Sequence, residues 1–130
     1  MAGTQRDTKV WQEAVGLAAD VIRVVRRTTR RETKAFTDAL MLAASAAASA
    51  IAEAPTRPTP SEERECYARA RRALVTVETQ LAIARVSGII PTSVHAQLAS
   101  RVASVSQRVS NSLNHVEHHH TDSLPLLADT

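Results

Sequence analysis

Five closely spaced arginines are the residues of this 130-residue chain whose chemistry best suits ligand binding. They are Arg23, Arg26, Arg27, Arg30 and Arg31, and we call them the arginine patch. Guanidinium groups contact phosphates, so the patch predicts a surface for the backbone of RNA or DNA. The alternative interpretation is a solvated helix end, because cations in the last turn of a helix complement its negative dipole end. No aromatic residue lies among these arginines, which disfavours stacking of single-stranded bases.

Two carboxylates are placed where acid–base chemistry is conceivable. Glu53 and Glu78 fall at the edges of the apolar stripes of two predicted helices. A catalytic pair needs a nucleophile or a metal set that converges with it, and the sequence offers neither. We therefore expect no catalytic residues and no enzyme activity. We interpret Glu53 and Glu78 as carboxylates of a structural ion pair whose basic partner is Arg71, with Arg57 as the alternative partner.

Metal and cofactor chemistry has weak candidates. The histidines at 115, 118, 119 and 120 form the one metal-like cluster, and His115 and His119 would share a helix face. The cluster lies at a chain end that is prone to fray, so a polar helix end is the alternative to a metal site. The single cysteine, Cys66, excludes an internal disulfide, and no glycine-rich phosphate loop is present. We predict no metal, no cofactor and no small-molecule substrate.

Composition excludes several other classes of protein. Hydrophobic residues make up 44% of the chain, which is too many for a disordered protein. Charged residues interrupt the first 20 positions, so no signal-peptide core is expected. The longest uncharged apolar run, residues 39–52, is mostly alanine, and from its length we predict that it does not span a membrane. A cytoplasmic protein is the resulting expectation.

Apolar residues recur every three or four positions in four segments, which predicts four helices over about 8–28, 30–54, 60–87 and 92–117. Thr29 and Glu32 match a capping box at the first break, Thr59 and Pro60 form a strong helix start, and Gly88 is a left-handed stop. Short links make neighbouring helices antiparallel. We therefore predict an all-α fold, an antiparallel up-down-up-down four-helix bundle, as one domain over residues 1–120 with a flexible tail at 121–130.

Neutral surface is unusually extensive for a bundle of this size. The segment 39–52 carries no charge on any face, and Ser45 and Ser49 are its polar residues. The third predicted helix adds a second apolar line outside its core seam, formed by Val75, Thr79, Ile83 and Val86. Uncharged surfaces of this kind are typical of buried protein contacts. We predict a homo-oligomer that buries them, the alternative being a monomer with an alanine- and serine-rich surface.

Three short motifs occur in order along the chain: Val10-Trp11, Ile51-Ala52-Glu53 and Glu78-Thr79-Gln80-Leu81. They resemble, in turn, the opening helix, the Asn-Ile-Ala-Glu-Gly signature and the third-helix motif of a family of bacterial four-helix bundle proteins. The family is often described as products of intervening sequences in large-subunit ribosomal RNA genes. The resemblance covers roughly residues 8–115. Ala50 and Ala54 stand where the family usually has Asn and Gly.

The resemblance implies a four-helix bundle that assembles into a closed homo-oligomer, a pentamer in members of known structure. It also suggests a link to nucleic acid, because a related branch serves as accessory subunits of retroelement reverse transcriptases. It implies no established enzyme activity. The resulting hypothesis is a non-enzymatic structural protein whose partner is itself, and the alternative is a nucleic-acid-binding accessory module that uses the arginine patch.

Overall fold

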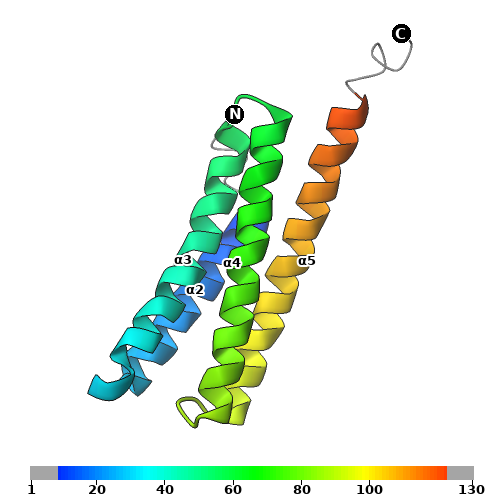
Figure 1. The fold of residues 1–130 in the computed structure, drawn as a ribbon. Coiled ribbons are helices and arrows are strands. Elements are labelled where there is room, and N and C mark those ends of the chain that lie inside the picture. The colour runs from blue at the N-terminus through cyan, green and yellow to red at the C-terminus, as the bar shows by residue number, and fades with distance from the viewer. Residues whose placement is uncertain (1–8, 123–130) are drawn as a thin grey trace.

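Four long helices make up nearly all of the described chain, as a computed structural model shows (Figure 1). The structure describes the backbone of residues 9–122 and the side chains of residues 9–117. The helices are α2 (Lys9–Thr28), α3 (Lys34–Glu53), α4 (Pro60–Val86) and α5 (Thr92–Asp122). Two short 3-10 turns, η1 (Arg31–Thr33) and η2 (Ala54–Thr56), flank α3, and the described residues form no strand.

Consecutive helices run in opposite directions and lie side by side, which confirms the all-α, up-down-up-down bundle (Figure 1). Helix α4 packs against α3 on one flank and α5 on the other, and α2 packs against α3. The contact between α2 and α5 closes the bundle and is the smallest of the four neighbouring pairs. The side of the bundle between α2 and α5 is therefore where surface grooves are to be expected.

The core is one continuous apolar cluster that runs along all four helices. Its members on α4 follow the predicted spacing of three and four, and all of them are buried: Tyr67, Ala70, Leu74, Val77, Leu81 and Ala84. Those on α5 do the same: Leu98, Val102, Val105, Val109, Leu113 and Val116. Burial of these side chains supplies most of the stability of the bundle, since the hydrophobic effect scales with the apolar area removed from water.

The break between α2 and α3 differs from the predicted capping box. The Thr29 hydroxyl donates to the carbonyl oxygen of Val25 and lies 3.1 Å from the hydroxyl of Thr37, so it does not cap the next helix. The backbone N–H of Arg30 donates instead to the hydroxyl of Thr33, at 3.2 Å. Thr37 is 1% exposed, so its contact with Thr29 fixes the corner between α2 and α3 from inside.

The starts and stops of the later helices follow their sequence signals. Thr59 is the N-cap of α4, and its side chain accepts from the backbone N–H of Glu62 at 3.1 Å. Pro60 occupies the first turn, where its missing N–H costs nothing. Gly88 has a φ of 84°, in the left-handed region that favours glycine after a helix. Backbone bonds from Ile89 and Ile90 to the carbonyl of Ala84 complete the turn into α5.

Helix α5 extends to Asp122, beyond the end near 117 that the sequence pattern predicts. Its last two residues, Thr121 and Asp122, belong to the helix and not to the predicted tail. The rest of the predicted tail, 123–130, lies outside the described residues, as do residues 1–8.

The segment Arg31–Thr56, which contains α3, is long and apolar enough to cross a membrane by length and composition alone. The segment has 26 residues, its most apolar window of 18 residues has a mean hydropathy of 1.5, and 33% of that window is buried in the bundle. The uncharged run 39–52 is only part of this segment, so the prediction of no membrane span, made from the length of that run, was too strict. The finding is weak evidence for a membrane, because the core helix of a bundle passes the same test.

Candidate binding surfaces

The arginine patch lies at the corner where α2 ends and α3 begins. All five of its arginines are exposed there. Arg26 and Arg27 belong to the last turn of α2, where they complement the dipole of the helix. Arg23 pairs with Asp20, while the other four arginines make no ion pair among the described residues. The patch is thus available to an anionic partner.

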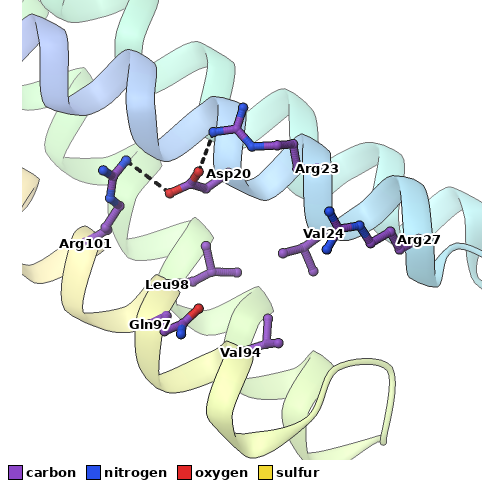
Figure 2. Close-up of a pocket in the computed structure, with 8 residues that line it drawn as sticks. All are labelled: Asp20, Arg23, Val24, Arg27, Val94, Gln97, Leu98 and Arg101. Carbon is purple, nitrogen blue, oxygen red and sulfur yellow. Dashed lines mark hydrogen bonds and ion pairs between the residues drawn. The ribbon is translucent and has the colours of Figure 1, made fainter.

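Helix α5 contributes residues to this region that the sequence argument did not connect with it. The Nη1 atom of Arg101 lies 3.1 Å from Oδ2 of Asp20, and the Nη2 atom of Arg23 lies 2.7 Å from Oδ1 of the same carboxylate. Figure 2 shows Asp20 between the two guanidinium groups. Beside this triad, α2 and α5 enclose a groove of about 400 Å³, the α2–α5 groove, lined by Asp20, Arg23, Val24, Arg27, Val94, Gln97, Leu98 and Arg101.

A second polar link joins α2 to α5 further along the bundle. One carboxylate oxygen of Glu13 accepts from the hydroxyl of Ser104 at 2.6 Å, and the other accepts from Nε of Arg108 at 2.9 Å. The hydrogen bond from Ser104, together with the charge of Arg108, lowers the pKa of Glu13 below its ordinary value of 4.5. Partial desolvation acts in the opposite direction and does not prevail. Glu13 is therefore ionised at neutral pH and bridges the two helices.

The predicted oligomer interface is exposed on the single chain. Val75, Thr79, Ile83 and Val86 lie on the outer side of α4, and Ser45 and Ser49 on the outer side of α3. The structure adds Leu42, a residue that the sequence argument did not select for this surface although it falls in the uncharged run. We call these seven residues the outer face. Its larger members are exposed by 70% (Leu42), 56% (Val75), 49% (Ile83) and 76% (Val86).

The ion pair of Glu53 is made with Arg69, not with Arg71 or Arg57. Oε1 of Glu53 lies 3.2 Å from Nη2 of Arg69, and this guanidinium also donates to Sγ of Cys66 at 3.2 Å. These hydrogen bonds, that to Cys66 first, raise the pKa of Arg69. Positions two apart on a helix point about 200° apart, so Arg71 cannot face α3 when Arg69 does.

The predicted members of that ion pair are thus not brought together. Arg71 and Glu78 are both exposed on α4, and within the part of the chain that the structure describes no ion pair joins either of them to Glu53. The pair between Glu53 and Arg69 is about half exposed on both sides, so it contributes at most about 1 kcal/mol to stability. A carboxylate in this setting has a structural role.

The histidine cluster cannot be assembled from the described side chains. His115 is exposed on α5, and the side chains of His118, His119 and His120 lie outside the described residues. Among the described residues, no group of three or more His, Cys, Asp or Glu side chains is placed to hold a metal ion. Tyr67, the residue that follows Cys66 on α4, is 7% exposed, and this burial raises its pKa.

These features define a class of protein: a small four-helix bundle with an arginine-rich corner, a groove between its first and last helices, and an uncharged outer face. The chain belongs to the 23S rRNA-intervening sequence protein family, whose sequence model matches residues 6–111. No curated protein matches the chain. The resemblance inferred from the short motifs is therefore confirmed for most of the chain's length.

Proposed function

We propose that the protein is a non-enzymatic structural protein whose bundles assemble into a closed homo-oligomer through the outer face. The observation that supports the proposal is the exposure of large apolar side chains, led by Val86 and Leu42. Large apolar side chains that are exposed together on a small bundle often mark a contact with another protein. From the family resemblance we expect a ring of five subunits.

The outer face is formed by parts of two helices that lie alongside each other. Helices α3 and α4 are antiparallel, and the contact of Glu53 with Arg69 sets their register. Residues 39–49 of α3 consequently lie alongside the C-terminal half of α4, which carries Val75, Ile83 and Val86. The two uncharged stretches thus lie at the same level along the bundle.

A second copy of the chain is the occupant that best fits this surface. The outer face has no charged member, so it offers nothing specific to nucleic acid or to a charged partner. On α3 the exposed residues that follow Leu42 are alanines and serines, which let another helix approach closely. A stable interface buries about 800 Å² on each partner, an area that two adjacent helices can supply.

Light scattering coupled to size-exclusion chromatography tests the proposal. We expect the full chain to elute as a particle several times heavier than one 14.0 kDa chain. Ile83→Glu combined with Val86→Glu should reduce the mass to that of one chain while the helical circular dichroism persists, since both side chains are exposed on the bundle. Ser61→Glu, in the first turn of α4, is the matched control and should leave the mass unchanged. A 14.0 kDa particle from the unaltered chain at micromolar concentration would refute the assembly.

A second candidate function is contact with a nucleic-acid backbone, and the four arginines of the patch without an ion pair favour it. Binding of duplex RNA or DNA should weaken steeply with salt, because each phosphate contact releases counterions. Arg30→Glu with Arg31→Glu should abolish binding in a fluorescence-anisotropy titration. Arg71→Glu with Arg85→Glu changes the net charge by the same amount on exposed sites of α4. This control variant should keep much of the nucleic-acid binding. Equal losses in the two double variants would refute a specific patch.

A further inference from the structure

The α2–α5 groove has the size of a site for a small molecule. Its volume of about 400 Å³ lies within the usual range for such sites, about 300–1,000 Å³. It opens between α2 and α5, the neighbouring helices that have the least extensive contact, and residues from both helices line it. No role in the proposed assembly uses it.

Positive charge is concentrated around the groove. Three guanidinium groups, those of Arg23, Arg27 and Arg101, line it together with one carboxylate, that of Asp20. Asp20 engages one oxygen with Arg23 and the other with Arg101, so the carboxylate brings both guanidinium groups to the same side of the groove. Arg27 makes no ion pair within the described residues. The lining carries a net charge of +2, from three cations and one anion.

The rest of the lining is apolar. Val24 on α2 and Leu98 on α5 point toward each other across the groove, and Val94 continues the apolar surface one turn away (Figure 2). Leu98 is buried, and Val24 and Val94 are half-buried and pack against the core. The carboxamide of Gln97 supplies one neutral polar group among them. A ligand that fits must therefore combine strong negative charge with an apolar portion.

We propose that the α2–α5 groove binds a phosphate monoester that carries a small apolar group. A monoester has a charge of about −1.5 to −2 at pH 7, which matches the net charge of the lining, whereas a diester has half that charge. The phosphate would contact Arg27 and the free N–H groups of Arg23, since a guanidinium group can donate two parallel hydrogen bonds to one phosphate group. The apolar group would rest on Val24, Val94 and Leu98. The site is complete within one chain and so goes beyond the proposed assembly.

Isothermal titration of the full chain with phenyl phosphate tests this proposal. We expect saturable binding of phenyl phosphate and weaker binding of methyl phenyl phosphate, a diester with one charge. Inorganic phosphate should also bind more weakly, because it cannot use the apolar lining. No saturation with phenyl phosphate, or equal affinity for phenyl phosphate and inorganic phosphate, would overturn the proposal.

Two pairs of variants assign the binding to the groove. Arg27→Gln should weaken binding of phenyl phosphate by about tenfold or more, the usual effect of losing a charged hydrogen bond. Arg31→Gln is the matched control, an exposed arginine of the same patch outside the groove, and should change affinity less than about twofold. Val94→Ser should weaken the binding of phenyl phosphate without weakening the binding of inorganic phosphate. Equal effects of Arg27→Gln and Arg31→Gln would overturn the assignment.

The same samples separate this proposal from the proposed assembly. Arg27→Gln lies outside the outer face, so the mass of the particle in light scattering should not change. Ile83→Glu with Val86→Glu should dissociate the assembly and leave phenyl phosphate binding intact. Loss of phenyl phosphate binding in that dissociated variant would overturn a site that is complete within one chain.

Discussion

The guanidinium group of Arg101 lies directly against Gly16, and a Cβ atom built on that glycine would stand 2.6 Å from Nη1 of the arginine. Gly16 is in the interior of α2, where glycine is a poor helix former. Its lack of a side chain gives Arg101 room to cross from α5 and reach Asp20, one turn further along α2. Glycine at this position therefore lowers the helix propensity of α2 but leaves room for an arginine that lines the α2–α5 groove.

Gly16→Ala should leave the bundle as stable or make it more stable, by up to about 1 kcal/mol in the free energy of unfolding. Alanine gains about 1 kcal/mol over glycine within a helix. The displaced group is the far end of a flexible side chain, and its half-exposed pair with Asp20 is worth at most about 1 kcal/mol. Urea denaturation measures the difference.

The background of Arg101→Gln provides the control for this substitution. There the pair with Asp20 is already lost, so Gly16→Ala should show the full gain of about 1 kcal/mol. A loss of more than about 1 kcal/mol in the unaltered background would show that Arg101 has no alternative position.

Acid should weaken the link between Glu13 and α5. The pKa of Glu13 is lowered in the folded chain, first by the hydrogen bond from Ser104 and then by Arg108. A carboxyl whose folded pKa lies below its unfolded value adds stability above the unfolded value, and that stability is lost as the pH falls through the folded value. Glu13→Gln should therefore reduce the free energy of unfolding by about 1 kcal/mol at pH 7 and by less at low pH.

Titration of the Glu13 carboxyl by nuclear magnetic resonance checks the cause of this effect. Ser104→Ala should raise the pKa of Glu13 toward 4.5, because Ser104 makes the largest contribution to the shift. Ser100→Ala, which removes another exposed hydroxyl one turn from Ser104 on α5, is the control and should leave the titration unchanged. The same titration curve in both variants would exclude the Ser104 hydrogen bond as the cause.

Removal of the cap of α4 should destabilise the bundle measurably. The side chain of Thr59 accepts from the backbone N–H of Glu62, and loss of such a cap costs about 1 kcal/mol. We expect that cost for Thr59→Ala in thermal or urea unfolding. Thr59→Ser keeps the accepting oxygen and should cost little, so equal losses in the two variants would show that the hydroxyl does not cap the helix.

The fold was predictable because its signals are local and repeated. Apolar residues every three or four positions place Leu74, Val77 and Leu81 on one stripe, and that stripe is buried. The break after α2 was less predictable, since Thr28, Thr29 and Thr33 all have hydroxyls that can bond to nearby backbone. Which of these hydroxyls caps the next helix depends on the residue at which α2 ends. Tertiary packing at Thr37 determines that residue.

The binding surfaces were only half visible in the sequence. The arginines of the patch lie close together along the chain, so they could be grouped from their spacing alone. Arg101 is 81 positions from Asp20, and neither residue carries a local signal of their contact. Similarly, Arg69 and Arg71 are equivalent by residue type, and only the rotation of α4 against α3 selects Arg69 for Glu53. Long-range geometry of this kind depends on helix packing angles that one sequence does not state.

Two leucines distinguish the core from the outer face. Leu81 is 1% exposed within the bundle, so Leu81→Ala should cost about 2–5 kcal/mol at any protein concentration, through lost burial and a cavity. Leu42 is 70% exposed on the single chain, so Leu42→Ala should cost almost nothing where the chain is monomeric. If the outer face is buried between copies, the cost of Leu42→Ala should rise with protein concentration, because assembly stabilises the folded state by mass action. Thermal unfolding at a series of concentrations measures both effects, and a cost for Leu42→Ala that does not depend on concentration would remove Leu42 from the interface.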